Sequence, residues 1–106
     1  MILLVMPTAF DVVAEPARRE ILDLLIDGPR AVGELVRGTG LSQPNTSRHL
    51  RILREAGLVQ SRPDGQRRLY ELRPDGLAEL ERWLAPYRRL WRRSLTDLER
   101  HLDEEE

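Results

Sequence analysis

Residues 41–59 read LSQPNTSRHLRILREAGLV, a helical pattern with small polar residues at its front. At 100° per residue, Thr46, Leu50 and Leu53 share one apolar face. The opposite side and the N-terminal end carry Gln43, Pro44, Asn45, Ser47, Arg48 and Arg51. Short amides and hydroxyls reach donors and acceptors on base edges, arginines bind phosphate, and acidic residues would be repelled there. This front therefore predicts a surface that contacts DNA.

A capped surface helix without a partner is the alternative interpretation of the same stretch. Ser42 fits an N-cap, Pro44 fits the first helical turn, and capping could also account for Asn45. Capping does not account for the other polar residues and arginines along the front of the helix. We therefore favour the DNA-contacting interpretation, given the basic segment that follows.

This second basic segment is LVQSRPDGQRRLYEL, residues 58–72. Its apolar residues predict two short strands, and the sequence Pro-Asp-Gly-Gln at 63–66 predicts the turn between them. We expect this β-hairpin to contact phosphates or the minor groove through Arg62, Gln66, Arg67 and Arg68. Ordinary solvated charges are the alternative. Because side chains alternate along a strand, at least one of these arginines should face away from DNA.

The charge of the chain is unevenly distributed, although its net value is only −1. All 17 basic residues are Arg. Residues 42–73 contain seven Arg and three acids, whereas residues 97–106 contain six acids and one Arg. A GC-rich genome would explain the absence of Lys but not this clustering. Arg is suited to bidentate contacts with phosphate and guanine, so the basic cluster agrees with a nucleic-acid partner.

The composition excludes several classes of protein. A chain of 106 residues that is 41% hydrophobic predicts one soluble domain, and the absence of cysteine excludes disulfides, zinc knuckles and thiol catalysis. No apolar run reaches membrane-spanning length and no signal peptide is evident, so we expect a cytoplasmic location. Met6 before Pro7 could be the true start, which would make residues 1–5 an extension. Without a phosphate-cradling loop or a nucleophile–base pair, an enzyme is the least favoured class.

Several short helices must position the polar front. Residues 8–14 predict the first helix, Pro16 begins a second that ends at Gly28, and residues 31–38 predict a third before the glycine turn at 38–40. Gly57 fits the C′ position of the helix at 43–56, so that Leu58 folds back in a Schellman-type closure. Two short helices, a tight turn and a basic hairpin together predict a winged helix-turn-helix, mainly α with a small β-hairpin.

The chain from about residue 74 to residue 103 is also predicted to be helical. Its apolar seam has nearly heptad spacing: Leu77, Leu80, Leu84, Tyr87, Trp91, Leu95, Leu98 and Leu102. Pro86 should kink or split the helix, so we predict segments at 75–85 and 86–103, followed by an acidic tail at 104–106.

Trp83 and Leu90 lie outside this seam and form a second apolar ridge. One ridge could cover the helix-turn-helix core while the other meets a second subunit. Packing wholly within one chain is the alternative. For so short a chain we favour a dimer through the last six seam residues, Leu84, Tyr87, Trp91, Leu95, Leu98 and Leu102.

The two histidines are the remaining candidates for chemistry. His49 lies at the edge of the apolar helix face, where we expect a packed side chain with one hydrogen bond, for example to a phosphate, rather than a metal ligand. His101 follows Asp97 by four residues, with Glu104 and Glu105 one turn on, a spacing that a metal could use. An acid-rich helix end produces this spacing by chance, so we predict neither a metal nor a cofactor.

The segments FDVVAEPARREILDLLIDGPRAVGEL, LSQPNTSRHLRILREAGLV and RPDGQRRLYEL resemble the ArsR/SmtB family of bacterial winged-helix repressors. The resemblance covers about residues 8–103. It implies a homodimer built from the terminal helices that binds an imperfect palindrome in double-stranded DNA and represses transcription. It also implies that Gln43, Pro44, Ser47 and Arg48 face the major groove and that the hairpin arginines form the wing.

The chain departs from the pattern of this family at three places, two of which concern its metal-sensing members. The segment AVGELV holds no thiolate sensor motif, and a lone His101 does not reproduce the paired His and acid pattern of the C-terminal helix. Ala31 stands where Ser is often the N-cap, a loss of about 1 kcal/mol of local stability. The long tail LAPYRRLWRRSLTDLERHL resembles the branch of the family that lacks obvious metal sites.

We thus interpret residues 1–106 as one domain, with helix-turn-helix and wing at 8–73 and dimerisation helices at 74–103. The expected function is a sequence-specific, homodimeric DNA-binding repressor. Two alternatives stay open: a winged-helix protein-interaction module without DNA binding, and a metal- or ligand-released sensor of the same fold. The sequence identifies no effector, and we expect no membrane partner.

Overall fold

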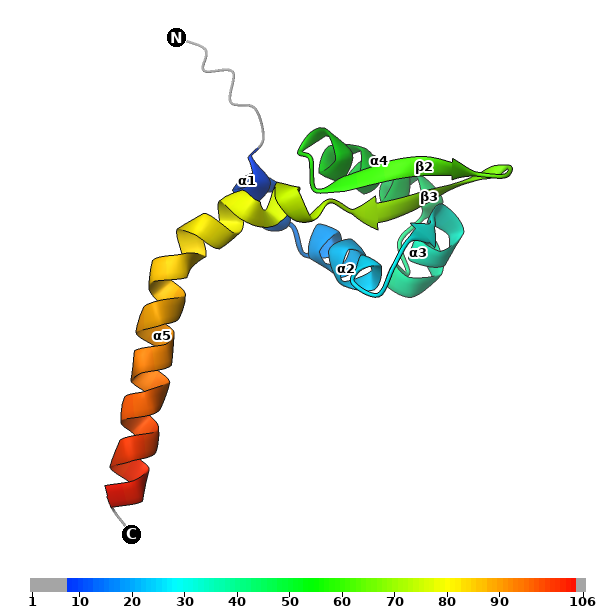
Figure 1. The fold of residues 1–106 in the computed structure, drawn as a ribbon. Coiled ribbons are helices and arrows are strands. Elements are labelled where there is room, and N and C mark those ends of the chain that lie inside the picture. Colours follow the sequence, from blue (N-terminus) through cyan, green and yellow to red (C-terminus); the bar gives the residue numbers. More distant parts are fainter. Residues whose placement is uncertain (1–7, 105–106) are drawn as a thin grey trace.

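The winged-helix head and one long helix make up residues 8–104, the part of the chain that the computed structural model describes (Figure 1). The suggested extension at 1–5 and the last two residues of the acidic tail lie outside this range. The elements in chain order are α1 (Ala9–Val13), α2 (Pro16–Leu25), β1 (Arg30–Ala31), α3 (Val32–Thr39), α4 (Gln43–Glu55), β2 (Val59–Asp64), β3 (Arg67–Leu72), the 3-10 helix η1 (Pro74–Leu77) and α5 (Ala78–Glu104).

The end of α4 is closed by the expected Schellman motif. The amide of Leu58 donates to the carbonyl of Leu53 and that of Gly57 to the carbonyl of Arg54, each at 3.0 Å. Gly57 has φ +79°, a left-handed conformation in which a side chain is strained. The chain therefore leaves α4 in a fixed direction and enters β2 after a single turn.

The sheet has three strands rather than the two of the expected hairpin. Its order is β1-β3-β2, and both pairings are antiparallel. Arg30 pairs with Tyr70 and Ala31 with Leu69, so β1 ties the start of α3 to the hairpin. The prediction missed β1 because a strand of two residues has no measurable alternation.

The core of the head is formed by side chains from helices on one side and from the base of the hairpin on the other. Its buried apolar residues are Ala9, Val12, Ile21, Leu25, Leu35, Leu50, Leu53, Leu58 and Val59. These residues come from α1 to α4 and from the junction into β2, so the core fixes α4 relative to the wing.

The junction between the head and α5 depends on close backbone contact. A Cβ on Gly76 in η1 would overlap the carbonyl oxygen of Gly57, so the two segments meet where only glycine fits. Leu77 and Leu80 then pack against the head core. These contacts hold the beginning of α5 at the end of α4.

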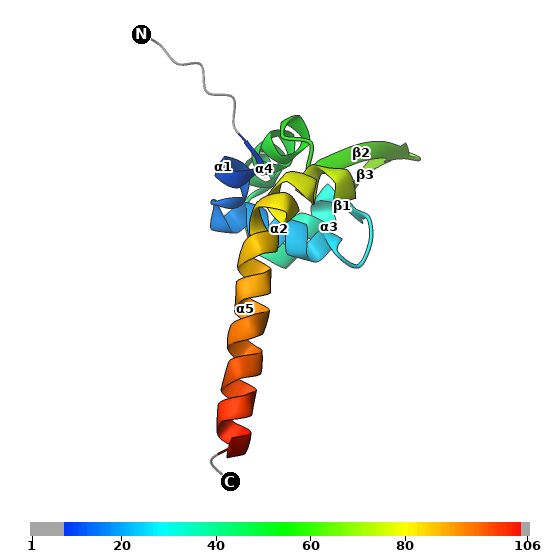
Figure 2. The ribbon, with the colours of Figure 1, turned by 60° about the vertical axis from the view of Figure 1, so that its left-hand side comes forward.

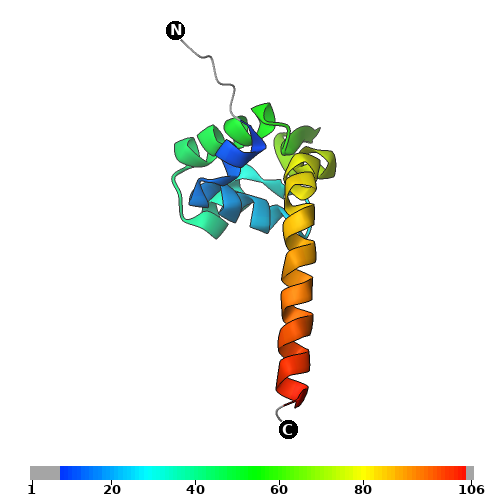
Figure 3. The same cartoon turned by 90° about the vertical axis from the view of Figure 1, so that its left-hand side faces the viewer.

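The prediction of two C-terminal segments is wrong, because α5 runs unbroken from Ala78 to Glu104 with Pro86 inside it. Proline has no N–H to donate to the carbonyl of Arg82 one turn earlier, a loss that helices accommodate by bending. Figure 1 shows α5 changing direction between its yellow and orange parts. Figures 2 and 3 show its remainder as a rod that leaves the head.

Candidate nucleic-acid interface

The N-terminal turn of α4 is held rigidly by its own cap and by burial. The hydroxyl of Ser42 accepts a hydrogen bond from the amide of Asn45 at 3.2 Å. Thr46 is fully buried, and its hydroxyl donates to the carbonyl of Ser42 at 2.9 Å. The predicted N-cap at Ser42 and the predicted place of Thr46 on the buried face are therefore confirmed, and both fix the direction in which the front of α4 points.

The polar front of α4 lies opposite its buried face. The structure places all six predicted DNA-contacting residues of the helix at exposed positions: Gln43, Pro44, Asn45, Ser47, Arg48 and Arg51. The buried residues of the same helix are Thr46, His49, Leu50 and Leu53. The helix thus presents short polar groups at its N-terminal end and arginines along its exposed side. It contains no acidic residue before Glu55.

His49 is a packing residue that connects α4 to α2. Its side chain is 5% exposed, and its Nδ1 accepts a hydrogen bond from Nε of Arg18 at 3.3 Å. An accepting Nδ1 requires the neutral imidazole, with its proton on Nε2. Burial lowers the pKa of His49 below 6.5, and the charges of Arg18 and Arg48 lower it further. The expected single hydrogen bond goes to Arg18 rather than to a phosphate.

The wing arginines lie on two different faces of the hairpin. Cross-strand partners point to the same side of a sheet, and the pairs are Arg62 with Leu69, Pro63 with Arg68, and Asp64 with Arg67. Arg62 and Arg67 therefore share one face, and Arg68 lies on the other face with Ser61 and Tyr70. The predicted alternation of direction is confirmed.

Arg62 and Arg67 are each engaged by carboxylates. Arg62 lies 3.5 Å from Glu71, and Nε of Arg67 donates to Asp64 at 3.1 Å.

Gln66 is exposed at the two-residue tip of the hairpin beside Gly65, whose φ is +65°. The tip is thus a tight loop that projects from the head (Figure 2).

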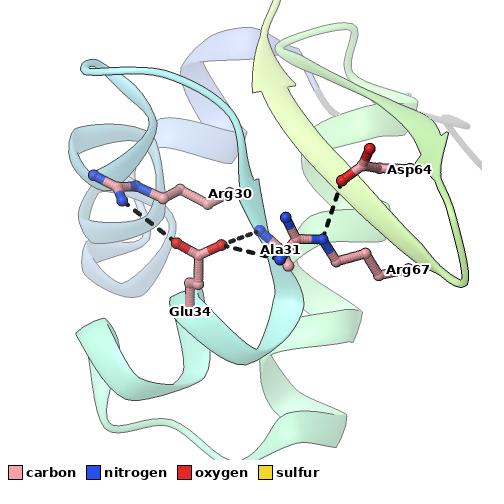
Figure 4. A network of polar contacts seen from close by, with 5 residues as sticks. All are labelled: Arg30, Ala31, Glu34, Asp64 and Arg67. Carbon is pink, nitrogen blue, oxygen red and sulfur yellow. Dashed lines mark hydrogen bonds and ion pairs between the residues drawn. The ribbon is translucent and has the colours of Figure 1, made fainter.

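Glu34 of α3 connects the helix-turn-helix to the wing (Figure 4). Its Oε1 accepts from the amide of Ala31 at 3.2 Å and lies 3.9 Å from Arg67, while its Oε2 lies 3.4 Å from Arg30. The bond from the Ala31 amide lowers the pKa of Glu34, and the neighbouring arginines lower it further. Glu34 thus supplies the half of a capping box in which the N3 side chain accepts from the backbone amide of the N-cap residue, and its carboxylate also lies beside Arg67.

Sequence reasoning missed a basic contact between α4 and the hairpin. The hydroxyl of Ser61 accepts from Nη1 of Arg68 at 3.2 Å and from Nη1 of Arg54 at 3.5 Å. Arg54 follows Arg51 by three residues and Ser47 by seven, so helical periodicity could have placed it on the polar front. No pattern in the sequence singles out Ser61.

The apolar face of α5 is uncovered in the single chain. Of the described residues of α5, none is buried, and its exposed large apolar side chains are Trp83, Leu84, Tyr87, Leu90, Trp91, Leu95, Leu98 and Leu102. Trp83 makes an edge contact with Phe10 of α1 at 5.8 Å between ring centroids. The expected cover of the head core by the second ridge is therefore limited to this contact, because the rod carries Leu90 away from the head.

A metal-binding cluster and a membrane-spanning helix are both absent from the described residues. Within residues 8–104 no group of three or more His, Asp or Glu side chains is arranged to hold a metal ion. Over the same range, no helix combines the length and the apolar character needed to cross a membrane.

The sequence is similar to a family of bacterial regulators. Residues 15–61 match the family described as bacterial regulatory protein, arsR family. The HTH-type transcriptional regulator Rv2034 of Mycobacterium tuberculosis is 44% identical over 97 residues, which cover 92% of this chain and 88% of that protein. The transcriptional repressor SdpR of Bacillus subtilis is 33% identical over 79 residues, covering 74% of this chain and 88% of that one.

The fold is similar to solved structures of the same kind. One is the solution structure of the homodimeric winged helix-turn-helix DNA-binding domain of Mb0332 from Mycobacterium bovis, a possible ArsR-family regulator. It matches with a TM-score of 0.62 and 32% identity over 74% of this chain and 72% of that one. The winged helix-turn-helix fold of this chain is thus shared with a protein of related sequence.

Proposed function

This chain belongs to the arsR family of bacterial regulatory proteins and is a winged helix-turn-helix transcriptional regulator, and we propose that it acts as a homodimeric repressor. In this proposal the dimer presents two copies of α4 and the wing to an imperfect palindrome in double-stranded DNA. One observation carries the proposal: the exposed front of α4 is polar, Arg-lined and free of acids up to Glu55, and it lies beside a basic hairpin.

The N-terminal part of α4 enters the major groove. The N-terminal end of α4 exposes Gln43, Ser47 and Arg48. In a recognition helix, the side chains at this end contact base edges. Arg51 lies further along and reaches the phosphate backbone, while the hairpin approaches the adjacent minor groove with Gln66 and its arginines. The first contacts specify the sequence, and the second fix the register of the protein on the duplex.

The second copy of the chain covers the apolar face of α5. An antiparallel pairing of two α5 helices, centred near Arg93, brings Leu84 opposite the partner's Leu102 and Trp91 opposite the partner's Leu95. The charge pattern favours this direction, because residues 82–96 contain five Arg and no acid, whereas residues 97–104 contain four acids. Antiparallel pairing sets residues 82–89, with three Arg, against the partner's residues 97–104 with their four acids, and parallel pairing would set like charges together.

Repression follows from occupancy of the operator. A bound dimer excludes other proteins from the same stretch of DNA, and the relative SdpR is itself named a transcriptional repressor. The described residues do not indicate which effector the protein would respond to, so we propose none.

DNA binding is tested by fluorescence anisotropy with a duplex selected by the purified protein. Ser47→Ala and Arg48→Ala should each weaken binding to the selected duplex by about 5- to 150-fold, since a base contact contributes about 1–3 kcal/mol. Arg100→Ala removes the same charge from the far end of α5 and should leave affinity unchanged. Equal affinity of the wild-type protein for selected and scrambled duplexes would overturn sequence-specific recognition. Affinity that does not fall with rising salt would favour a protein-interaction module instead.

The antiparallel pairing is tested by exchanging charges. Arg88 and the partner's Glu99 lie opposite each other in this arrangement, and both flank the apolar seam at helical spacing. Arg88→Glu and Glu99→Arg should therefore each weaken the dimer in sedimentation equilibrium. The double variant restores opposite charges and should regain much of the lost association. A double variant weaker than either single variant would contradict the antiparallel arrangement.

A further inference from the structure

Two guanidinium groups from different elements converge on the hydroxyl of Ser61. Arg54 lies near the C-terminal end of α4, and Arg68 lies on β3. Both donate through Nη1 to the same oxygen, at 3.5 Å and 3.2 Å. In residues 8–104, neither arginine has an ion pair with a carboxylate, in contrast to Arg62 and Arg67 on the opposite face of the hairpin.

The fold holds these three residues together. The Schellman turn after α4 returns the chain directly into β2, so Ser61 lies seven residues after Arg54 and beside the last turn of the helix. Ser61 pairs with Tyr70, and Arg68 pairs with Pro63, which puts both side chains on the face of the hairpin toward the core and α4. The two arginines thus meet at Ser61 because the core holds α4 and the hairpin in fixed positions.

A shared hydroxyl does not balance two positive charges. Ser61 offers one neutral oxygen. The two guanidinium charges repel each other at this close range, and only an anion or solvent can offset that repulsion. Arginine guanidinium groups bind phosphate oxygens through paired N–H donors, and a serine hydroxyl adds one more donor. The chemistry of the group is therefore that of a phosphate site.

The position of the group selects the source of the phosphate. If α4 lies in the major groove and the hairpin reaches the neighbouring minor groove, the phosphodiester strand between these grooves passes between α4 and the hairpin. Arg54 and Arg68 bridge these two elements. We propose that Arg54, Ser61 and Arg68 form a clamp for a single backbone phosphate of the operator, which locks the angle between the recognition helix and the wing.

This inference rests on the proposed DNA-binding function, and a double-mutant cycle tests it. Arg54→Ala and Arg68→Ala should each weaken binding about tenfold in anisotropy, the effect of one charged hydrogen bond. Because both side chains hold one phosphate, the double variant should lose less than the product of the single losses. The slope of log affinity against log salt should fall by about one in the double variant, against about two if the arginines held separate phosphates.

Methylphosphonate substitution locates the phosphate. Each phosphate of the selected duplex is replaced in turn by an uncharged methylphosphonate. At one position in each half-site, the replacement should weaken the wild-type protein but leave the Arg54→Ala/Arg68→Ala double variant unaffected. Arg62→Ala, a wing variant on the opposite face, should keep its sensitivity at that position.

The outcomes separate the clamp from the proposed function. If the wild-type protein binds its selected duplex but the double variant remains sensitive at every position, the clamp is wrong and DNA binding stands. Additive single losses with a slope change of two would also overturn the single-phosphate clamp. If the wild-type protein binds no duplex, the proposed function itself fails. Circular dichroism and sedimentation establish that the variants are folded and dimeric, as expected for exposed arginines.

Discussion

The head and α5 use the same kind of amphipathic helix in opposite ways. In the head, α2 and α4 bury the centres of their apolar faces, with Ile21, Leu50 and Leu53 at most 1% exposed. In α5 the seam is equally regular, yet Trp91 is 64% exposed and Leu98 is 54% exposed. The head is therefore complete as one chain, whereas α5 presents an apolar face that one chain cannot cover.

This difference separates two sources of stability. The head is stabilised by contacts within the chain, so its stability should not depend on protein concentration. A helix of 27 residues with no buried side chain gains little from packing, and helices gain most of their stability in proteins from a packed apolar face. The order of α5 should therefore depend on association, and thus on concentration.

Truncation in the head should have the largest effect. Leu53→Ala removes a fully buried side chain and should lower the free energy of unfolding by about 2–5 kcal/mol. Urea titrations at several protein concentrations measure the loss, which should be similar at each concentration. A loss below 1 kcal/mol would contradict the closed core.

Truncation in α5 should act on association instead. Trp91→Ala removes a large aromatic side chain from the centre of the seam and should weaken the dimer by about 2 kcal/mol or more, roughly 30-fold in dissociation constant. Sedimentation equilibrium measures this change. Ile26→Ala is the matched control, because Ile26 is 68% exposed but belongs to the head, and it should leave the dimer unchanged. Equal effects of the two variants would remove the distinction between the regions.

A methyl group at the junction should destabilise the protein by an intermediate amount. Gly76→Ala forces a Cβ against the carbonyl oxygen of Gly57, a backbone atom that cannot move without disturbing the end of α4. Overpacking of this kind costs about 1–3 kcal/mol, to be measured by chemical denaturation. Gly33→Ala places its Cβ at an ordinary 3.5 Å from Arg37 and should be neutral or slightly stabilising. A neutral Gly76→Ala variant would show that η1 does not press on this turn.

Acid should produce the smallest effect, confined to the head. Folding lowers the pKa of His49 below 6.5. Between the pKa of the folded state and that of the unfolded state, the unfolded state therefore binds more protons. The contribution of neutral His49 is complete above pH 6.5 and is lost as the pH falls through the folded-state pKa. Thermal unfolding between pH 7.5 and 5 should show this decrease, and His49→Asn should reduce it. An unchanged pH profile in His49→Asn would assign the decrease to other groups.

Much of the head could be predicted because its signals are local. Ser42, Gly57 and Pro16 mark helix ends by their own backbone and side-chain chemistry, and the structure confirms all three. The error at Pro86 has the opposite origin. Proline disfavours a helix interior locally, but a single missing hydrogen bond does not outweigh the rest of a 27-residue helix.

The candidate site was predictable as a surface but not as a set of contacts. Periodicity placed the exposed residues of α4 correctly, because a helix face follows from spacing alone. The engagement of Arg67 by Glu34, and the convergence of Arg54 and Arg68 on Ser61, join residues far apart in the chain. Such pairings depend on the angle between α4, α3 and the hairpin, which the core sets and the sequence pattern does not state.

The central claim is that two copies of α4, joined through α5, read DNA with two-fold symmetry. The most direct test is selection of duplexes from a random library by the purified protein, followed by sequencing. We predict an inverted repeat whose half-sites are centred about 10–10.5 base pairs apart or a multiple of that distance. Enrichment of a single unrepeated half-site, or no enrichment at all, would contradict the account.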